Sequence, residues 1–389
     1  MHITRQAVER LASYHSPDWP IVSLYLRVDR EHITDDHYSI RLKNLLKQVL
    51  DNPGIELSRA QLEAVEADLD RIRVFFRDHG DEFGQGVALF ASSAANLWEV
   101  YEAPREVGNH VEVDFRPVIA PLVRVLELCE PFCVCLVSRD RARIFMGHMS
   151  EFGERAVRLD QEVPGQHEQG GWSQARYQRH IEEHVHQHFK RLAADLFALF
   201  EQEPFRFLVL GGPHEVVSDF LDYLHPYLRE RYIGTFYVLM EASAKQVREE
   251  AAKIVREWLR QEKQRYLDLL RNEALSNDMG VTGLEKVVEA LQMGNVLSLI
   301  VDDRLEAPGS SCLHCGAVQP PAAEQPDRCL YCGGPVRRHA NIVPKVYANA
   351  YRQKANLVFL TERELQEQLA ELGGIGAILR FRVTPAPGS

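Results

Sequence analysis

The stretch Phe205-Arg-Phe-Leu-Val-Leu210, followed by the turn Gly211-Gly-Pro213 and a helical pattern over His214–Arg231, decides the fold of this 389-residue chain. The first segment is short and apolar and ends at turn residues, which is typical of a buried strand. A strand over Tyr237–Glu241 and an amphipathic helix from Ser243 to about Asn272 continue the alternation. Strands that alternate with helices predict an α/β layer structure.

The preceding residues extend this central region toward the N-terminus. Phe132–Val137 and Arg143–Gly147 predict a hairpin, and a long helix is expected from about Ser173 to Glu201. Further upstream, Ser58 and Gln61 have the spacing of a capping box at the start of a helix. The first 130 residues therefore predict a mixed fold, with a helix over Tyr38–Leu50 and strands at Ile21–Val28, Val87–Phe90, Leu97–Tyr101 and Val111–Phe115.

The C-terminal residues repeat the alternation of helix and strand. The expected elements are Gly283–Gln292, Val296–Val301, Leu357–Leu360, Glu362–Leu372 and Ala377–Val383. We therefore predict a mixed α/β protein of three domains: residues 1–130, a central domain over 131–272, and residues 273–384 with a four-cysteine insert at about 308–340.

Composition excludes several classes of protein. The 45 Lys and Arg residues against 56 Asp and Glu give a formal charge of −11, which disfavours general binding to nucleic acid but allows a local basic patch. No apolar stretch has the ~18 residues of a membrane span. The N-terminal residues lack the apolar core of a signal peptide, so we expect a cytoplasmic protein without a membrane partner.

The seven cysteines fall into two groups. Cys129, Cys133 and Cys135 lie in an apolar run and are expected in a core. The others form two Cys-x-x-Cys pairs separated by 13 residues, each followed by glycine: Cys312, Cys315, Cys329 and Cys332. Four thiolates at this spacing predict one structural zinc ion with a closed coordination sphere, and iron in a rubredoxin-like site is the alternative.

The segment Gly165-Gln-His-Glu-Gln-Gly-Gly-Trp-Ser-Gln-Ala-Arg-Tyr-Gln-Arg179 carries the strongest functional signal. Gly170 and Gly171 precede a helix whose first N–H groups can bind an anion or a polarised carbonyl. Arg176 and Arg179 share a helix face that suits phosphates. A flexible helix cap and a functional loop both remain open. Further along the helix, His180, His184 and His188 recur every fourth residue, on a polar face near RNA or solvent or at a metal site.

This segment resembles the peptidyl-transferase-centre loop of the archaeal and eukaryotic class I peptide chain release factors. In that family, Gly-Gly-Gln is followed by Ser, one or two small residues, Arg and an aromatic residue. The matching positions here are Gly170, Gly171, Ser173, Ala175, Arg176 and Tyr177. Gly283-Leu-Glu-Lys-Val-Val-Glu-Ala-Leu-Gln-Met-Gly294 with Val296–Val301, and the segment Gly373–Val383, resemble the third domain of the family. The chain is similar to the bacterial branch, which also includes Pelota-like rescue factors and hibernation factors.

The resemblance implies a role for each domain. The first would face the decoding centre, and the second would carry a catalytic loop of Gly170, Gly171, Trp172 and Gln174 to the P-site peptidyl-tRNA ester. Arg176, Arg179, Lys190 and Arg191 would bind RNA phosphates. The third domain would be an α/β domain like ribosomal protein L7Ae with a zinc-ribbon insert, and its expected partners are ribosomal RNA or protein and a translational GTPase.

Two departures from the family pattern leave alternatives open. Trp172 occupies the position of the catalytic glutamine, with Gln174 two residues later, so peptidyl-tRNA hydrolysis and non-catalytic binding for hibernation or ribosome splitting are both retained. The helix Tyr38-Ser-Ile-Arg-Leu-Lys-Asn44 lacks the Asn-Ile-Lys-Ser decoding motif, which favours stalled or idle ribosomes over stop codons. A zinc-stabilised RNA-binding protein unrelated to the ribosome is the third interpretation.

Overall fold

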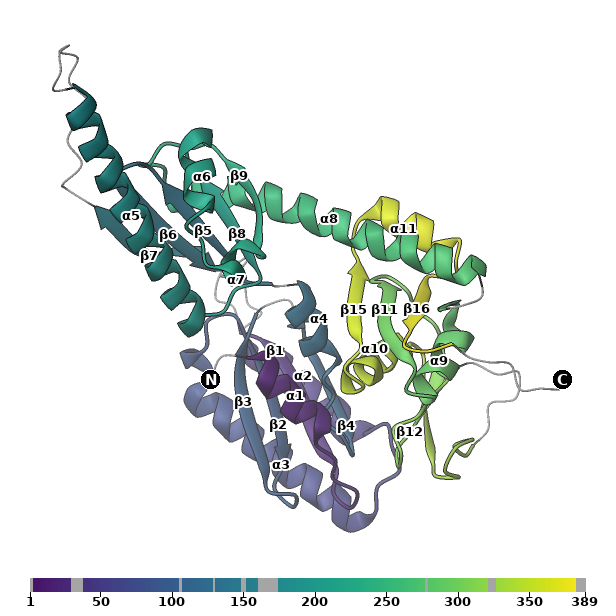
Figure 1. Ribbon diagram of the computed structural model, residues 1–389. Coiled ribbons are helices and arrows are strands. Elements are labelled where there is room, and N and C mark those ends of the chain that lie inside the picture. The colour runs from purple at the N-terminus through teal and green to yellow at the C-terminus, as the bar shows by residue number, and fades with distance from the viewer. Residues whose placement is uncertain are drawn as a thin grey trace. The chain divides into compact units, whose positions relative to one another are not determined.

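The computed structural model describes residues 3–28, 38–104, 107–128, 130–147, 152–159, 174–276, 279–320 and 327–382. The chain divides into two compact units, one from Met1–Leu128 with Lys263–Ser389 and the other from Cys129–Glu262. Helices and strands occur in both units (Figure 1), so the mixed α/β class is confirmed. The boundaries of the three domains stay a prediction. No helix among the described residues is long and apolar enough to cross a lipid bilayer.

The N-terminal part of the first unit is built on an antiparallel sheet in the order β3-β2-β1-β4. Its strands are β1 (Ile21–Arg27), β2 (Gly86–Ser92), β3 (Leu97–Ala103) and β4 (His110–Asp114). The helices are α1 (Arg5–Ser13), α2 (Tyr38–Asp51), α3 (Arg59–His79) and α4 (Ala120–Leu128), with a 3-10 turn over Gly80–Glu82. Apolar residues of β1, such as Leu24, pack against α2 and α3. The predicted capping box of Ser58 and Gln61 is confirmed at the start of α3.

The C-terminal part of the first unit contains a mixed sheet in the order β10-β16-β11-β15, in which β11 and β15 are parallel. Its strands are β10 (Gly280–Thr282), β11 (Val296–Asp302), β15 (Asn356–Leu360) and β16 (Ile375–Leu379). The helices are α9 (Leu284–Gln292), α10 (Val343–Arg352) and α11 (Arg363–Ala370). A small separate sheet in the order β13-β12-β14 contains β12 (Gly309–Cys312), β13 (Val318–Gln319) and β14 (Val336–His339).

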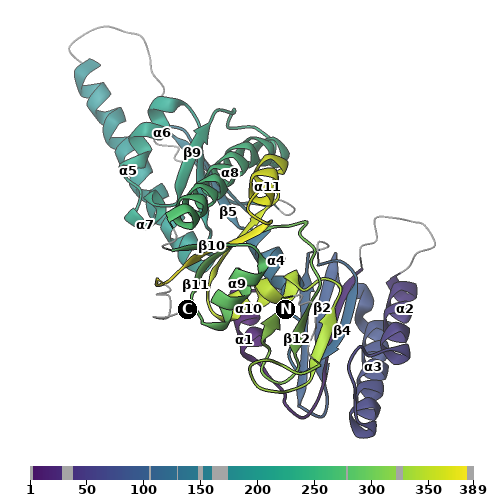
Figure 2. The same cartoon turned by 90° about the vertical axis from the view of Figure 1, so that its right-hand side faces the viewer.

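The second unit is a five-stranded sheet in the order β7-β6-β5-β8-β9. Its strands are β5 (Phe132–Val137), β6 (Arg141–Gly147), β7 (Phe152–Leu159), β8 (Phe207–Gly211) and β9 (Tyr232–Phe236). The helices are α5 (Gln174–Gln202), α6 (His214–Leu221), α7 (Pro226–Arg229) and the first half of α8 (Ala244–Ser276). The first three helices share one apolar cluster with the sheet, and α8 shares another. Figure 2 shows the backbone of these helices in a second view. Alternate residues of β5, such as Cys133 and Val134, belong to these two clusters.

Two predicted elements of the second unit are wrong. The last strand is Tyr232–Phe236 rather than Tyr237–Glu241, because the earlier segment pairs in parallel with β8. Tyr237 and Leu239 are 68% and 65% exposed. The single helix predicted over 214–231 is two helices, because Pro226 lacks an N–H group and instead begins α7.

A cluster of charged side chains joins the two parts of the first unit. Lys345 of α10 lies 2.9 Å from a carboxylate oxygen of Glu112 and 2.8 Å from one of Asp114, both on β4. Arg337 of β14 also pairs with Glu112, at 2.9 Å. The lysine side chain is only 15% exposed, and both carboxylates are 11% exposed. Such pairs are costly to break, because the remaining charge stays buried without its partner.

The cluster shifts two ionisation equilibria. Burial alone would raise the pKa of Glu112, but Lys345, His110 and Arg337 outweigh it and hold that pKa well below its usual 4.5. Burial would likewise lower the pKa of Lys345, but Asp114 and Glu112 raise it above 10.5. The stabilisation from Glu112 is therefore present above about pH 4.5 and is lost as the pH falls, and that from Lys345 is lost only as the pH rises past 10.5.

We predict that Lys345→Met lowers the free energy of unfolding by about 3 kcal/mol at pH 7, because buried Asp114 loses the lysine that pairs with it and buried Glu112 loses one of its two cations. The loss should shrink as the pH falls below about 4.5, because Glu112 then takes up a proton in the unfolded chain but not in the folded wild type, where its pKa is lowered. Urea titrations at pH 7 and pH 3.5 measure both values. Glu63→Gln, in the exposed pair with Arg59, is the matched control and should change stability by less than about 0.5 kcal/mol. An equal loss at both pH values would assign the effect to packing.

Candidate functional site

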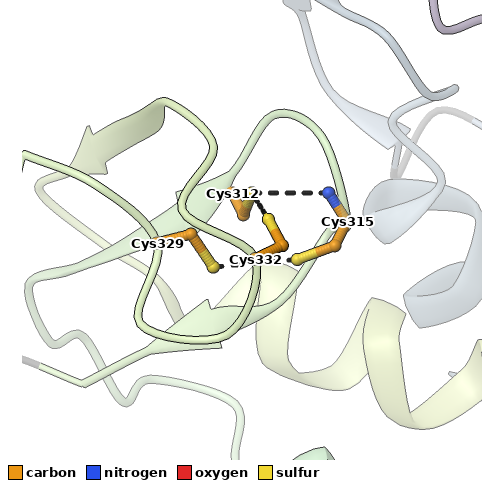
Figure 3. A group of neighbouring side chains, drawn as sticks. All are labelled: Cys312, Cys315, Cys329 and Cys332. Carbon is orange, nitrogen blue, oxygen red and sulfur yellow. Dashed lines mark hydrogen bonds between the residues drawn. The ribbon is translucent and has the colours of Figure 1, made fainter.

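Two short turns beside the small sheet bring the four predicted cysteines together. The Sγ atoms of Cys312, Cys315, Cys329 and Cys332 all lie within 4.8 Å of one another (Figure 3). Cys312 and Cys332 are 3.4 Å apart, and Cys315 and Cys329 are 3.7 Å apart, measured between sulfur atoms. Within the described ranges, this is the one group of three or more His, Cys, Asp or Glu side chains close enough to share a metal ion.

The backbone repeats one geometry at both pairs. Gly316 N–H donates to the carbonyl of Cys312, and Gly333 N–H donates to that of Cys329. Both glycines have positive φ, +77° and +70°, which side chains with a Cβ rarely adopt. Cys315 N–H and Tyr331 N–H donate to the sulfurs of Cys312 and Cys329 at 3.3 and 3.4 Å. These turns orient the sulfurs and hydrogen-bond two of them.

Gly334 follows the second turn under a tighter constraint. A Cβ there would lie 2.9 Å from the Cβ of His314 and 3.3 Å from the sulfur of Cys332. The absence of a side chain therefore lets the second turn approach the first. The N–H of Gly334 also lowers the pKa of the Cys332 thiol to about 6, whereas burial raises that of Cys315 to about 12.

The donor set fits a tetrahedral cation. Four sulfurs at the ~2.3 Å bond length of a thiolate site would stand about 3.8 Å apart, and two of the sulfur pairs measure 3.4 and 3.7 Å. A bound cation would favour the thiolate form and offset the desolvation that raises the pKa of Cys315. Because all four ligands come from the protein, no position is open for substrate, and the metal would be structural.

The predicted catalytic loop is only partly described. Gly170, Gly171 and Trp172 lie outside the described residues, and α5 begins at Gln174. Arg176 and Arg179 therefore belong to the first two turns of this helix. The long helix after the glycine pair is confirmed, whereas the catalytic role of the loop stays a prediction.

Further along α5, the described side chains separate into buried and exposed faces. Phe189, Leu192 and Leu196 are buried against the sheet, whereas Lys190 and Arg191 are exposed. Both predicted phosphate ligands are thus accessible to a partner. Their binding to RNA stays a prediction.

The polar face predicted for the histidines of α5 is wrong at His188, whose side chain is fully buried. The sequence pattern missed His186, which lies off that face and whose Nδ1 is 2.6 Å from the hydroxyl of Tyr223. No local sequence signal marks this contact, because Tyr223 lies 37 residues from His186 and follows a different helix, α6.

Two family models match consecutive parts of the chain. The model described as Bacterial archaeo-eukaryotic release factor family 10 matches residues 117–256. The model described as eRF1 domain 3 matches residues 259–383. The first match contains α5 and the sheet of the second unit, and the second contains the cysteine cluster.

Curated relatives align over nearly the whole chain. The peptide chain release factor subunit 1 of Archaeoglobus fulgidus is 27% identical, and that of Methanocaldococcus jannaschii is 23% identical, each with 98% of both chains covered. Among solved structures, an archaeal translation termination factor matches at 20% identity, 98% and 99% coverage and a TM-score of 0.27. Archaeoglobus fulgidus Pelota matches at 19% identity, 77% and 80% coverage and a TM-score of 0.33.

We predict that the four cysteines bind one Co²⁺ ion tetrahedrally, with the visible absorption of a four-thiolate site. Cys332→Ser removes one ligand and should abolish or strongly shift that spectrum. Cys133→Ser is the matched control, because Cys133 is a fully buried residue of β5 and should leave the spectrum unchanged. Titration of the metal-free protein with Co²⁺ measures both. An unchanged spectrum in Cys332→Ser would exclude this residue as a ligand.

Proposed function

We propose that this chain, which belongs to the bacterial branch of the archaeo-eukaryotic class I release factor and Pelota superfamily, hydrolyses the peptidyl-tRNA ester on stalled or terminating ribosomes. The observation that carries the proposal is the alignment with peptide chain release factor subunit 1 over 98% of both chains. The chain is a translation factor of release-factor and Pelota type, and the reaction is the part that we propose. We expect it in the cytoplasm, where ribosomes work.

The proposed chemistry belongs to the segment before α5. Gly170 and Gly171 let the backbone approach the ester closely, and the N–H groups at the start of a helix can stabilise an oxyanion. A water molecule attacks the ester carbonyl carbon, and the tetrahedral intermediate expels the 3′ oxygen of the tRNA, which takes up a proton. The backbone N–H of Trp172 stands where the family uses that of glutamine, and the Gln174 side chain would orient the water.

The remaining expected contacts divide between the parts of the chain. The N-terminal domain would face the decoding centre without reading a stop codon. Arg176, Arg179, Lys190 and Arg191 would pair with RNA phosphates. The C-terminal domain, of the L7Ae-like kind implied by the resemblance, would bind ribosomal RNA or protein and a translational GTPase.

We propose zinc as the ion of the cysteine cluster, in a zinc-ribbon insert. Zn²⁺ supplies no redox or hydrolytic chemistry in a closed four-thiolate site, and it would hold the two turns and β14 in place. Glycines after each pair and N–H groups directed at sulfur support this assignment.

We expect one zinc ion per chain in protein purified without chelators, measured by elemental mass spectrometry. Chelation should lower the melting temperature, because the binding energy of a structural ion contributes to folding. Cys329→Ser should lower the zinc content, and Cys135→Ser should not. Stoichiometric iron with the colour of a ferric thiolate site would contradict the zinc assignment.

Non-catalytic binding for hibernation or splitting is the second candidate function, and Trp172 favours it. An indole ring at the position of the catalytic glutamine can stack on an RNA base without taking part in hydrolysis. Both functions require the ribosome, and only the first requires release of the peptide.

We predict that the wild-type protein releases labelled peptide from ribosomes with peptidyl-tRNA in the P site and an empty A site. Gly171→Val should lower the release rate at least tenfold while ribosome co-sedimentation persists, because a branched side chain blocks close approach of the backbone. Gly153→Ala is the matched control, because a Cβ at Gly153 meets no atom within 4 Å, and it should release at the wild-type rate.

The two readouts separate the candidates. Tight co-sedimentation without release by the wild-type protein would reject hydrolysis and support the hibernation or splitting factor. Absence of both would reject a ribosomal function. Trp172→Ala and Gln174→Ala then identify which side chain the release step needs.

A further inference from the structure

A group of aromatic side chains lies along the outer edge of the contact between α5 and the α6–α7 segment. We call it the aromatic belt, and it consists of His186, Phe197 and Phe200 of α5 with Tyr223, His225 and Tyr227 of the α6–α7 segment. Figures 1 and 2 both show α6 and α7 beside α5. The first five rings are half-buried, and that of Tyr227 is 56% exposed. The belt therefore presents ring edges and faces at the surface of the second unit.

Ring contacts hold the belt in one arrangement. His186 packs against Tyr223 with ring centroids 5.2 Å apart, and Nδ1 of His186 lies 2.6 Å from the tyrosine hydroxyl. Phe197 stacks on His225 at 3.9 Å and 28°. His225 in turn meets Tyr227 edge-on at 5.0 Å. The most exposed ring is thus held by a chain of contacts from α5, and a ligand that stacks on it need not order it first.

Cations lie on both sides of the belt. Lys190 is exposed and stands one helical turn beyond His186, on the same face of α5 as Phe197. Arg231 places its guanidinium 4.5 Å above the ring of Phe200 and donates to the carbonyl of Tyr227 at 2.6 Å. Arg229 pairs with Asp222 at 3.1 Å, and both side chains are mostly exposed.

The α6–α7 segment also carries negative charges, which would repel an anion. Asp222 and Glu230 are exposed in the same segment. Solvent-exposed ion pairs contribute little stability, so Arg229 can exchange Asp222 for a stronger anion at small cost. Lys190 and Arg231 remain as further cations beside the rings. The three cations Lys190, Arg229 and Arg231 thus outnumber the two carboxylates by one.

We propose that the aromatic belt is a docking surface for single-stranded RNA. Unpaired bases would stack on Tyr227 and against His225, and phosphates would pair with Lys190 and Arg229. Aromatic faces interleaved with cations are what single-stranded nucleic acid requires, because every base has a π face and every linkage carries a charge. The belt is distinct from Arg176 and Arg179, since His186 begins it about 10 Å along α5 from Arg179. Only the identity of the RNA as ribosomal RNA or tRNA rests on the proposed function.

The test uses the full-length protein and a fluorescein-labelled twelve-nucleotide oligouridylate, with binding followed by fluorescence anisotropy. Tyr227→Ala should weaken binding about tenfold, as expected for the loss of one stacked base. Tyr227→Phe keeps the ring and should bind like the wild type. Lys190→Ala should weaken binding and reduce its dependence on salt, because one phosphate contact is lost.

Matched controls come from the same unit. Tyr237 is 68% exposed in the segment after β9, and Lys245 is exposed at the start of α8. Tyr237→Ala and Lys245→Ala should bind the oligonucleotide like the wild type. Thermal melting of each variant tests whether an effect comes from loss of folding.

Several outcomes overturn the inference. They are the absence of binding by the wild type at low salt, equal weakening by Tyr227→Ala and Tyr237→Ala, and preference for duplex RNA over the single strand. If the belt binds a protein instead of RNA, the wild type should not bind the oligonucleotide even at low salt. The binding assay contains no ribosomes, so weaker oligonucleotide binding by Tyr227→Ala supports RNA docking at the belt even if the protein releases no peptide. Conversely, peptide release supports the proposed function even if the belt binds no RNA.

Discussion

Lys345 lies between two carboxylates of another part of the chain, and the first unit depends on this arrangement. Glu112 and Asp114 lie on the strand β4 of the N-terminal sheet, whereas Lys345 belongs to a helix more than two hundred residues later. Arg337 adds a second cation from β14, which follows directly on the cysteine turns. The small sheet with the cysteine cluster is therefore fixed at one end by sulfur geometry and at the other by charge.

In the second unit, position is set by apolar packing instead. The sheet buries α5 on one side and α8 on the other, so every side chain of β5 lies in a core. Among the side chains of α5 that the structure describes, Lys190 and others are exposed, and the packed helix that holds them cannot easily rotate. A rigid helix would suit the loop that we propose approaches an ester.

Much of this arrangement was predictable from residues that act locally. The capping box at Ser58, the buried strand Phe132–Val137 and the two cysteine pairs depend on neighbours in sequence, and the structure confirms each element. Tyr237–Glu241 was predicted as a strand because its residues favour strands, but pairing with β8 selected the preceding five residues. Choice of register is a tertiary effect, and propensity does not contain it.

The site was less predictable for the same reason. The ring contact between Phe197 and His225 joins a residue of α5 to the N-cap residue of α7, and neither residue stands out in the sequence. Tyr227 gained significance only once the structure showed that α6 ends at Leu221, that Pro226 begins α7, and that the following tyrosine is exposed. For the glycine loop the sequence alone supplies the functional interpretation, because Gly170 and Gly171 lie outside the described residues.

The discontinuity of the first unit has a consequence for how the protein is made. Residues 129–262 form a continuous stretch, so the second unit can fold as soon as it leaves the ribosome. The N-terminal sheet leaves the ribosome earlier, but Glu112 and Asp114 cannot form their ion pairs until Lys345 has been synthesised. The second unit can therefore finish folding before the first unit does. In a protein that we propose to act on stalled ribosomes, the N-terminal part of the first unit would reach its final packing only near the end of translation.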